Sequence, residues 1–328
     1  MPRQSPGSSS WGVLIALLLS LACTSVPPHP QIDALESGFS GRLARAHWKS
    51  IDGFYPRYPG SREDSIVRSY LAREFRRVGA EVRVLADGDR RHLIAELQGA
   101  SDDVVWLVAA YPSLRSADWV DDSGAAILLE LARVFGRAQP PYSLGFALAE
   151  TRPGELAASG DSLGPDGNWA PLSTAAAALA RLSEAGDSLA RGIEAEGGAD
   201  RVRAVIVFDT TARGRPTIAR DLRSHPEFRR LFWLSAARLG FGSMFPTDID
   251  WTSPDGLQLG FREHSMDRVL ALVHPHPHPH PQVEGRASSV ILPVAEVSPG
   301  IFESIGLVSV DGLSELMRRF EKIDAFLR

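Results

Sequence analysis

The feature that most constrains the fold is the stretch from Val104 to Phe135, whose pattern predicts a buried strand, a loop and a helix. Its first residues form an apolar run rich in β-branched side chains, which is typical of a strand covered on both faces. Asp121, Asp122 and Ser123 stand where side-chain acceptors cap a helix. The apolar residues of that helix predict one buried stripe: Ile127, Leu128, Leu131 and Val134. Because α/β sheets carry their sites where parallel strands run into helices, this acidic loop is a candidate site.

Strand-like and helix-like segments alternate along the rest of the chain. Short apolar or alternating runs predict strands at residues 81–85, 92–97, 104–109, 143–149, 203–208 and 269–273. Helical spacing predicts helices at residues 63–78, 174–183, 188–196 and 226–239 and at the C-terminus, while residues 240–267 look irregular. This alternation predicts a single α/β domain with a mostly parallel, mixed central sheet flanked by helices. We place that domain at residues 46–328, with a helical insertion at about residues 151–186.

The N-terminal segment has the pattern of an export signal. The apolar run Trp11–Ala22 is shorter than the ~20 residues that span a bilayer, which favours a signal peptide over residues 1–23. The only cysteine, Cys23, follows a small residue as at bacterial lipoprotein processing sites, so Cys23 is the expected lipidation site. Secretion with an unmodified cysteine is the alternative. Residues 24–45 are expected to form a tether.

Composition excludes several partners and chemistries. The net charge of -5 and the pI of about 6.0 leave no basic footprint, so nucleic acid is not an expected partner. The sequence carries no phosphate-binding loop, nucleophile elbow or catalytic cysteine pattern. We expect export across the inner membrane to a periplasmic or lipid-anchored state, with membrane contact only through the lipid.

Six strings in the right order resemble one known family. They are RYPGSRE (Arg57–Glu63), Val105–Arg133, Phe146–Glu150, Asp187–Leu189, VIVFDTTARGRPT (Val205–Thr217) and VLALVHPHP (Val269–Pro277). Together they resemble the zinc-dependent exopeptidase family of bacterial aminopeptidases, within its glutaminyl cyclase-like branch. The resemblance covers about residues 50–328. It implies an α/β fold and a site where oxygen and imidazole ligands hold zinc with one position open.

When the family's ligands are carried over residue by residue, the first position holds no ligand residue, and the second holds one only if the loop is shortened. The histidine ligand after the first strand of the site corresponds to Ala110. The aspartate that binds zinc before a Ser-Gly pair corresponds to Val120 without a gap, and to Asp121 if the loop is one residue shorter. Helix capping is an equally weighted interpretation of Asp121 and Asp122.

The next family positions are a pair of glutamates at a strand end, of which the first moves the proton and the second binds zinc. Here the pair is Ala149 and Glu150, so the resemblance implies a kept ligand and a lost general base. A positioned base contributes typically 10²–10⁴-fold to a rate. Asp209 matches a later aspartate that is a zinc ligand in two-zinc members and a catalytic partner in the cyclases. Its alternative interpretation is a loop or cap residue at a strand end.

The family's last ligand is a histidine after a proline segment, and it corresponds to Gly285. A shifted alignment offers His278 or His280, which belong to a tract from His274 to Pro281 that alternates His and Pro. A solvated repeat without a role is the preferred interpretation of this tract, and weak surface metal binding is the alternative. Asp250, Asp255 and His264 are weaker candidates in the irregular region.

Three function hypotheses follow. The first is a catalytically degenerate member of the family with a binding or scaffolding role on the cell envelope, because Ala110, Ala149 and Gly285 replace functional groups. Zinc would then be held only by Asp121, Glu150 and Asp209. Such a site lacks nitrogen and sulfur ligands and would bind zinc poorly. The second is an active zinc aminopeptidase or glutaminyl-peptide cyclotransferase. The third is weak metal binding by the His-Pro tract. For the first two, the expected ligands are peptide N-termini or small peptides.

Overall fold

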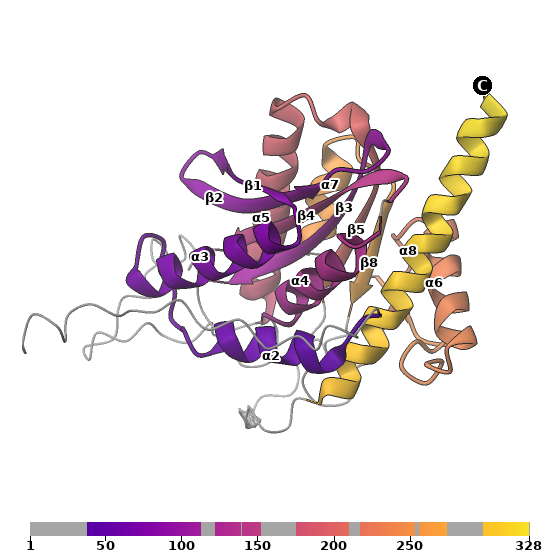
Figure 1. Ribbon diagram of the computed structural model, residues 1–328, viewed down its shortest axis with the longest axis horizontal. Coiled ribbons are helices and arrows are strands. Elements are labelled where there is room, and N and C mark those ends of the chain that lie inside the picture. Colours follow the sequence, from indigo (N-terminus) through magenta and orange to yellow (C-terminus); the bar gives the residue numbers. More distant parts are fainter. Residues whose placement is uncertain are drawn as a thin grey trace, which may run out of the picture.

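The computed structural model describes residues 38–112, 122–138, 140–151, 175–209, 217–252, 256–273 and 298–327. In this part of the chain eight strands form one sheet in the order β1-β2-β4-β3-β5-β8-β6-β7 (Figure 1). The strands are β1 (Glu81–Asp87), β2 (Arg90–Leu97), β3 (Ser101–Pro112), β4 (Tyr142–Thr151), β5 (Val202–Asp209), β6 (Ala219–Asp221), β7 (Asp250–Trp251) and β8 (Val269–Val273).

The middle of the sheet is parallel, and an antiparallel pair joins each flank to it, while the outermost pair, β6 with β7, is parallel. Strand β3 pairs in parallel with β4 and β5, and β5 pairs in parallel with β8. Strand β2 runs antiparallel to β1 and β4, and β6 runs antiparallel to β8. The prediction of a single α/β domain with a mostly parallel, mixed sheet is therefore confirmed.

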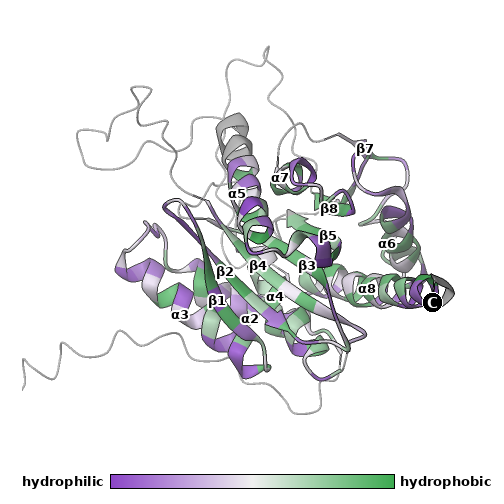
Figure 2. Cartoon of the chain, turned by 90° about the horizontal axis from the view of Figure 1, so that it is seen from above, coloured by the Kyte–Doolittle hydropathy of each residue, from purple (hydrophilic) through white to green (hydrophobic). Residues whose placement is uncertain are grey.

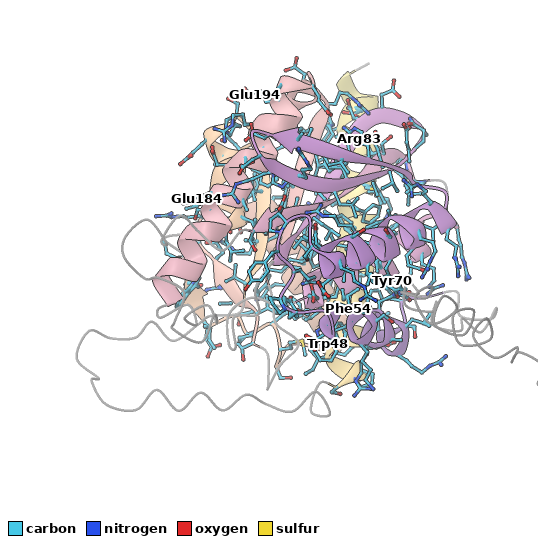
Figure 3. All side chains as sticks on the ribbon, turned by 90° about the vertical axis from the view of Figure 1, so that its left-hand side faces the viewer. Trp48, Phe54, Tyr70, Arg83, Glu184 and Glu194 are labelled. Carbon is cyan, nitrogen blue, oxygen red and sulfur yellow. The ribbon has the colours of Figure 1, made fainter. Side chains whose placement is uncertain are left out.

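Helices cover both faces of the sheet. One face carries α2 (Gly41–Asp52), α3 (Arg62–Arg77), α4 (Ser123–Phe135), α6 (Pro226–Arg238) and α8 (Pro299–Leu327). The opposite face carries α5 (Ala175–Ala195) and α7 (Leu257–Glu263), and a 3-10 turn spans Ala199–Arg201. Figure 2 shows apolar strands between these two layers. In Figure 3, Trp48 and Tyr70 lie with the first layer, and Glu184 and Glu194 lie on α5 on the other side of the sheet.

Alternation along β3 and β4 divides their side chains between two cores. Leu107, Ala109 and Tyr111 pack in the cluster under α3 and α4. Val108 and Ala110 pack in the cluster under α5 and α7. Because successive side chains of a strand point to opposite faces, each position of the site faces a definite layer.

Several sequence expectations differ from the structure. The tether was expected to reach residue 45, but α2 begins at Gly41 and buries Leu43 and Ala44, so residues 41–45 belong to the folded domain. Helix α4 is buried all round from residue 123 to residue 133 rather than along one stripe, because it lies between the sheet and the outer helices α2, α3 and α8. The two helices expected after residue 174 form one continuous helix, α5.

No helix in the described part of the chain is both long and apolar enough to cross a bilayer.

Gly124 gives a test of how closely α4 lies against the sheet. A Cβ at this position would come within 2.8 Å of the Ala109 Cβ and of the Phe208 carbonyl oxygen. We expect Gly124→Ala to lower the free energy of unfolding by about 1–3 kcal/mol, since such a clash forces backbone movement. Gly53→Ala is the control, because nothing lies within 4 Å of a Cβ there. Equal urea midpoints for the two variants would contradict the close packing.

Candidate functional site

The parallel strands end together at one edge of the sheet, called here the carboxyl edge. Strand β4 ends at Thr151 and β5 ends at Asp209, with β3 between them. Tyr111 of β3 stands beside Glu150 of β4, and Asp209 stands beside Val273 of β8. The backbones of Glu150 and Asp209 are therefore two strand spacings apart, about 10 Å. This is the edge at which α/β sheets bind ligands.

The structure does not place all the predicted site residues. Asp121, His278, His280 and Gly285 lie outside the described residues, as does Cys23. Asp209 is placed in β5, but its side chain is outside the described part. Predictions for these residues stay predictions.

Ala110 and Ala149 stand side by side in the parallel register of β3 and β4. Both are buried in the cluster under α5 and α7. Strand β4 continues through Thr151, so Glu150 points away from Ala149 toward the α3 layer. The positions that the resemblance assigns to a histidine ligand and a general base thus hold buried methyl groups on the face opposite the Glu150 carboxylate.

Glu150 is held by cationic and amide donors. Its side chain is 1% exposed, and its Oε2 accepts a hydrogen bond of 2.5 Å from the backbone N–H of Arg91. The Arg68 guanidinium lies 3.4 Å from the same oxygen. A carboxylate taken out of water needs such a partner, because an isolated buried charge is strongly disfavoured. Glu150, which corresponds to a family zinc ligand by the resemblance, is therefore paired with an arginine of the same chain.

Arg68 is the centre of a wider network on α3. Its Nε donates to Asp64 at 2.8 Å, and its Nη1 donates to the Arg91 carbonyl at 2.6 Å. The Tyr111 hydroxyl donates to Asp64 at 2.8 Å, and the Arg68 guanidinium lies over the Tyr111 ring. Burial raises the pKa of Tyr111, which keeps this hydroxyl protonated as a donor. The network ties α3 to the ends of β2, β3 and β4.

A second buried arginine holds Asp122, the residue before α4. The Arg57 Nη2 lies 2.7 Å from the Asp122 Oδ1, and both side chains are fully buried. Burial opposes the charged form of Arg57, but the electrostatic attraction of Asp122, Tyr55 and Tyr111 and the hydrogen bond to Asp122 outweigh it and raise the pKa of Arg57. The expectation that the Asp122 side chain caps the helix is wrong: Asp122 occupies the N-cap position without a side-chain capping bond, because its carboxylate faces Arg57.

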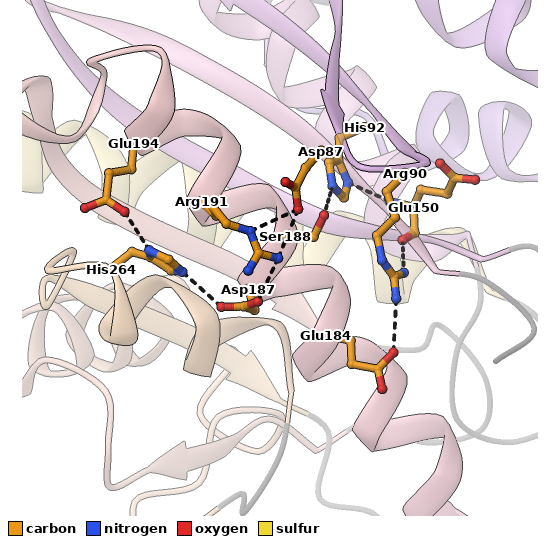
Figure 4. A network of polar contacts seen from close by, with 10 residues as sticks. All are labelled: Asp87, Arg90, His92, Glu150, Glu184, Asp187, Ser188, Arg191, Glu194 and His264. Atoms are coloured by element: carbon orange, nitrogen blue, oxygen red, sulfur yellow. Dashed lines mark hydrogen bonds and ion pairs between the residues drawn. The ribbon is translucent and has the colours of Figure 1, made fainter. Parts of the chain in front are cut away.

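A polar network on the opposite face joins the β1–β2 hairpin to α5 (Figure 4). The His92 Nδ1 accepts from the backbone N–H of Glu150 at 3.1 Å, and its Nε2 lies 3.0 Å from the Ser188 hydroxyl. A ring that accepts at Nδ1 carries its proton on Nε2 and donates it to Ser188. Hydrogen bonds from Arg191 and Ser188 outweigh partial burial and lower the pKa of Asp87. Because the His92 Nε2 donates to the Ser188 hydroxyl and does not accept its proton, the His92–Ser188 pair is not an activated nucleophile.

His264 connects α5 to the end of α7. Its Nε2 lies 2.9 Å from Asp187, and its Nδ1 lies 2.7 Å from Glu194 (Figure 4). Burial acts to lower its pKa, but the hydrogen bonds and charges of the two carboxylates outweigh burial and raise the pKa of His264. An imidazole between two carboxylates is favoured as the cation with both nitrogens protonated. His264 thus holds α7 to α5 and is called here the His264 clamp. Asp250, another candidate from the sequence, forms an ion pair with Arg220.

Compared by sequence, the chain matches no protein-family model and no curated protein. Solved structures do resemble it. A glutaminyl cyclase of Porphyromonas gingivalis has a TM-score of 0.65 at 17% identity, covering 85% of this chain and 99% of that one. A leucine aminopeptidase precursor of Bacteroides thetaiotaomicron has 0.64 at 17%, covering 88% and 99%. A zinc-dependent exopeptidase of Parabacteroides distasonis has 0.62 at 18%, covering 85% and 98%.

The chain has the fold of zinc-dependent exopeptidases and glutaminyl cyclases. The resemblance predicted from the six sequence strings is confirmed at the level of this fold. Solved structures with this fold include zinc-dependent exopeptidases, so we asked whether the described side chains of this chain could ligate zinc. Among those residues no group of three or more His, Cys, Asp or Glu side chains is arranged to hold a metal ion. Glu150 is engaged by Arg68, so the described donors do not fit zinc.

The buried Arg57–Asp122 pair predicts a large stability effect. Asp122→Ala should lower the free energy of unfolding by about 3–5 kcal/mol, because it leaves a buried guanidinium without its carboxylate. The double variant Arg57→Met, Asp122→Leu should recover much of this loss. Glu196→Ala is the control, since its pair with Arg83 is exposed and should contribute less than about 1 kcal/mol. A double variant that is less stable than Asp122→Ala in urea denaturation would contradict this assignment.

His264 predicts a pH-dependent contribution to stability. Because its pKa is raised on folding, the contribution is full below the unfolded pKa of about 6.5 and is lost as pH rises through the folded pKa. The stability difference between wild type and His264→Gln should therefore be larger at pH 6 than at pH 9, by less than about 1 kcal/mol. Burial and Arg268 lower the pKa of His225, so His225→Gln should show the opposite slope. Urea denaturation across pH tests both, and equal slopes would contradict the clamp.

Proposed function

We propose that this chain is a non-catalytic, envelope-associated protein with the exopeptidase fold that binds peptide N-termini or small peptides at the carboxyl edge of its sheet. One observation carries this proposal. The Glu150 carboxylate, which corresponds to a family zinc ligand by the sequence resemblance, is buried against the Arg68 guanidinium and the Arg91 N–H. A metal ion at Glu150 would have to replace a cation that the fold already supplies.

Electrostatics supports this interpretation over a metal site. Zinc and a guanidinium next to one carboxylate repel each other, so binding of zinc would require Arg68 to leave Asp64, Glu150 and the Arg91 carbonyl together. Ala149 adds a second argument, because a methyl group cannot carry the proton that peptide hydrolysis or glutamine cyclisation requires. The position of Arg68 thus supports a protein that retains the shape of the carboxyl edge but not the metal-dependent catalysis of the family.

Ligand binding and location rest on other arguments. Ligands of α/β sheets bind outside the carboxyl ends of the strands, which is where β3, β4, β5 and β8 end together in this chain. The neighbours in the comparison include a leucine aminopeptidase precursor and glutaminyl cyclases, and this resemblance is the reason for proposing peptide N-termini as the ligands. The apolar N-terminal run and Cys23 favour export and a lipid anchor.

The same resemblance supports a second candidate, an active zinc aminopeptidase or glutaminyl-peptide cyclotransferase. It requires Arg68 to leave Glu150, so that this carboxylate can hold zinc together with a histidine of the His-Pro tract, and it requires another group to replace the general base lost at Ala149. A third candidate is metal capture by that tract alone. The three candidates differ in how zinc binding responds to substitution.

The deciding experiment measures zinc content and turnover on the chain lacking residues 1–23. We expect less than about 0.1 zinc per chain after gel filtration, since carboxylates alone hold zinc poorly, and no turnover of aminoacyl anilides or glutaminyl peptides. Glu150→Gln should leave both unchanged but lower the free energy of unfolding by about 2 kcal/mol or more, because Arg68 loses a buried partner. Glu184→Gln is the control, since that carboxylate is exposed beside Arg90.

Peptide binding is measured on the same protein. A short peptide with a free N-terminus and its acetylated form are compared by calorimetry. Stoichiometric zinc that disappears in Glu150→Gln, together with turnover, would establish the active enzyme instead. Zinc that survives Glu150→Gln and disappears when His274 to His280 are replaced would establish capture by the tract.

A further inference from the structure

A cavity of about 320 Å³ lies away from the carboxyl edge, where α3 and α4 both end. It is lined by His47 of α2, by Glu74, Arg77 and Val78 from the end of α3, and by Leu129, Arg133, Gly136 and Arg137 from the end of α4. Helix α4 begins beside the carboxyl edge and ends 13 residues later, so this cavity is about 20 Å from Asp122. It is a separate place on the molecule from the site of the proposed function.

The two helix ends that line this cavity lie close together. A Cβ on Gly136 would come within 2.7 Å of the Val78 carbonyl oxygen, so the glycine lets α4 end directly against α3. His47 is fixed at the wall by a 2.7 Å hydrogen bond between its Nδ1 and the Tyr70 hydroxyl. The volume is at the lower end of small-molecule sites, which run from about 300 to 1,000 Å³.

The charges around the cavity leave a positive excess. Arg133 is engaged by Glu130 through two hydrogen bonds of 2.6 and 2.7 Å. The buried Glu74 lies 3.0 Å from Arg73, so both nearby carboxylates have their own guanidinium groups. Arg77 is exposed at the cavity and forms no ion pair with any described residue. The lining thus carries an uncompensated cation.

Arginines at helix C-termini often serve only to bond the last carbonyl groups. Here the backbone supplies those bonds. The Phe75 carbonyl accepts from the N–H groups of Val78 and Ala80, and the Arg76 carbonyl accepts from Gly79. At α4 the Ala132 carbonyl accepts from Gly136. The Arg77 guanidinium is therefore available to a ligand.

The lining also includes apolar side chains. Leu129 is buried and Val78 is half-buried at the cavity. We propose that the cavity binds a small organic anion, a carboxylate or phosphate monoester, whose charged group contacts the Arg77 guanidinium and whose apolar part packs on Val78 and Leu129. Guanidinium groups suit both anions because their planar donors match two oxygens at once. This inference stands independently of the function proposed for the carboxyl edge.

The test is calorimetric titration of the full chain with phenyl phosphate, benzoate, inorganic phosphate and benzyl alcohol. We expect phenyl phosphate or benzoate to bind at least about tenfold more tightly than benzyl alcohol, which lacks the charge, and than inorganic phosphate, which lacks the ring. Whichever of the two aromatic anions binds more tightly identifies the charged group.

Arg77→Gln should weaken that binding by about tenfold. Arg76→Gln is the matched control, because it removes the same charge from the neighbouring position of α3, where the side chain does not line this cavity. It should leave the affinity within about twofold. Thermal unfolding of both variants checks that each is folded. Equal weakening by the two substitutions, or an affinity for benzyl alcohol equal to that of the anions, would overturn the proposal.

Discussion

At the carboxyl edge two carboxylates are removed from water, and each is held by a guanidinium from one short segment that ends in α3. Arg57 holds Asp122, and Arg68 holds Glu150. Charges in such a place are tolerated only in pairs. Because Asp122 precedes α4 and Glu150 ends β4, these two pairs connect the start of α4, the end of β4 and the loop before α3. The layout of this edge therefore depends on these two arginines.

The sequence predicts most of the fold because burial on both faces leaves a clear pattern. Strand β8 was predicted with its observed bounds, and the strand, loop and helix around residues 104–135 were predicted in order. The start of α2 was missed, since its small and basic residues resemble a tether until Leu43 and Ala44 pack inside. Helix α7 was missed because it has only seven residues, too few for a helical period to be visible.

The candidate site was predictable only in part. Glu150 is at a strand end and can be found from local sequence, and so can the small residues at 110 and 149. The partners of the acidic residues cannot be found from local sequence. Arg57, for example, is 65 positions from Asp122, and nothing in the neighbouring sequence indicates that the two pair. The prediction that Asp122 caps the helix was wrong for the same reason. The Asp122 carboxylate binds a distant guanidinium instead of the helix N–H groups, because the charged donor forms the stronger hydrogen bond.

The two ends of α4 illustrate how one helix can serve two sites. Its first residue follows Asp122, whose charge is cancelled inside the protein, while its last turn contributes Arg133 to a cavity where Arg77 is not cancelled. At the carboxyl edge Arg57 and Arg68 are each paired with a carboxylate of the chain itself, so neither guanidinium is left to attract an external anion. At the opposite edge the excess of guanidinium remains exposed to solvent. Electrostatics thus favours recognition of anions at the edge opposite to the carboxyl edge.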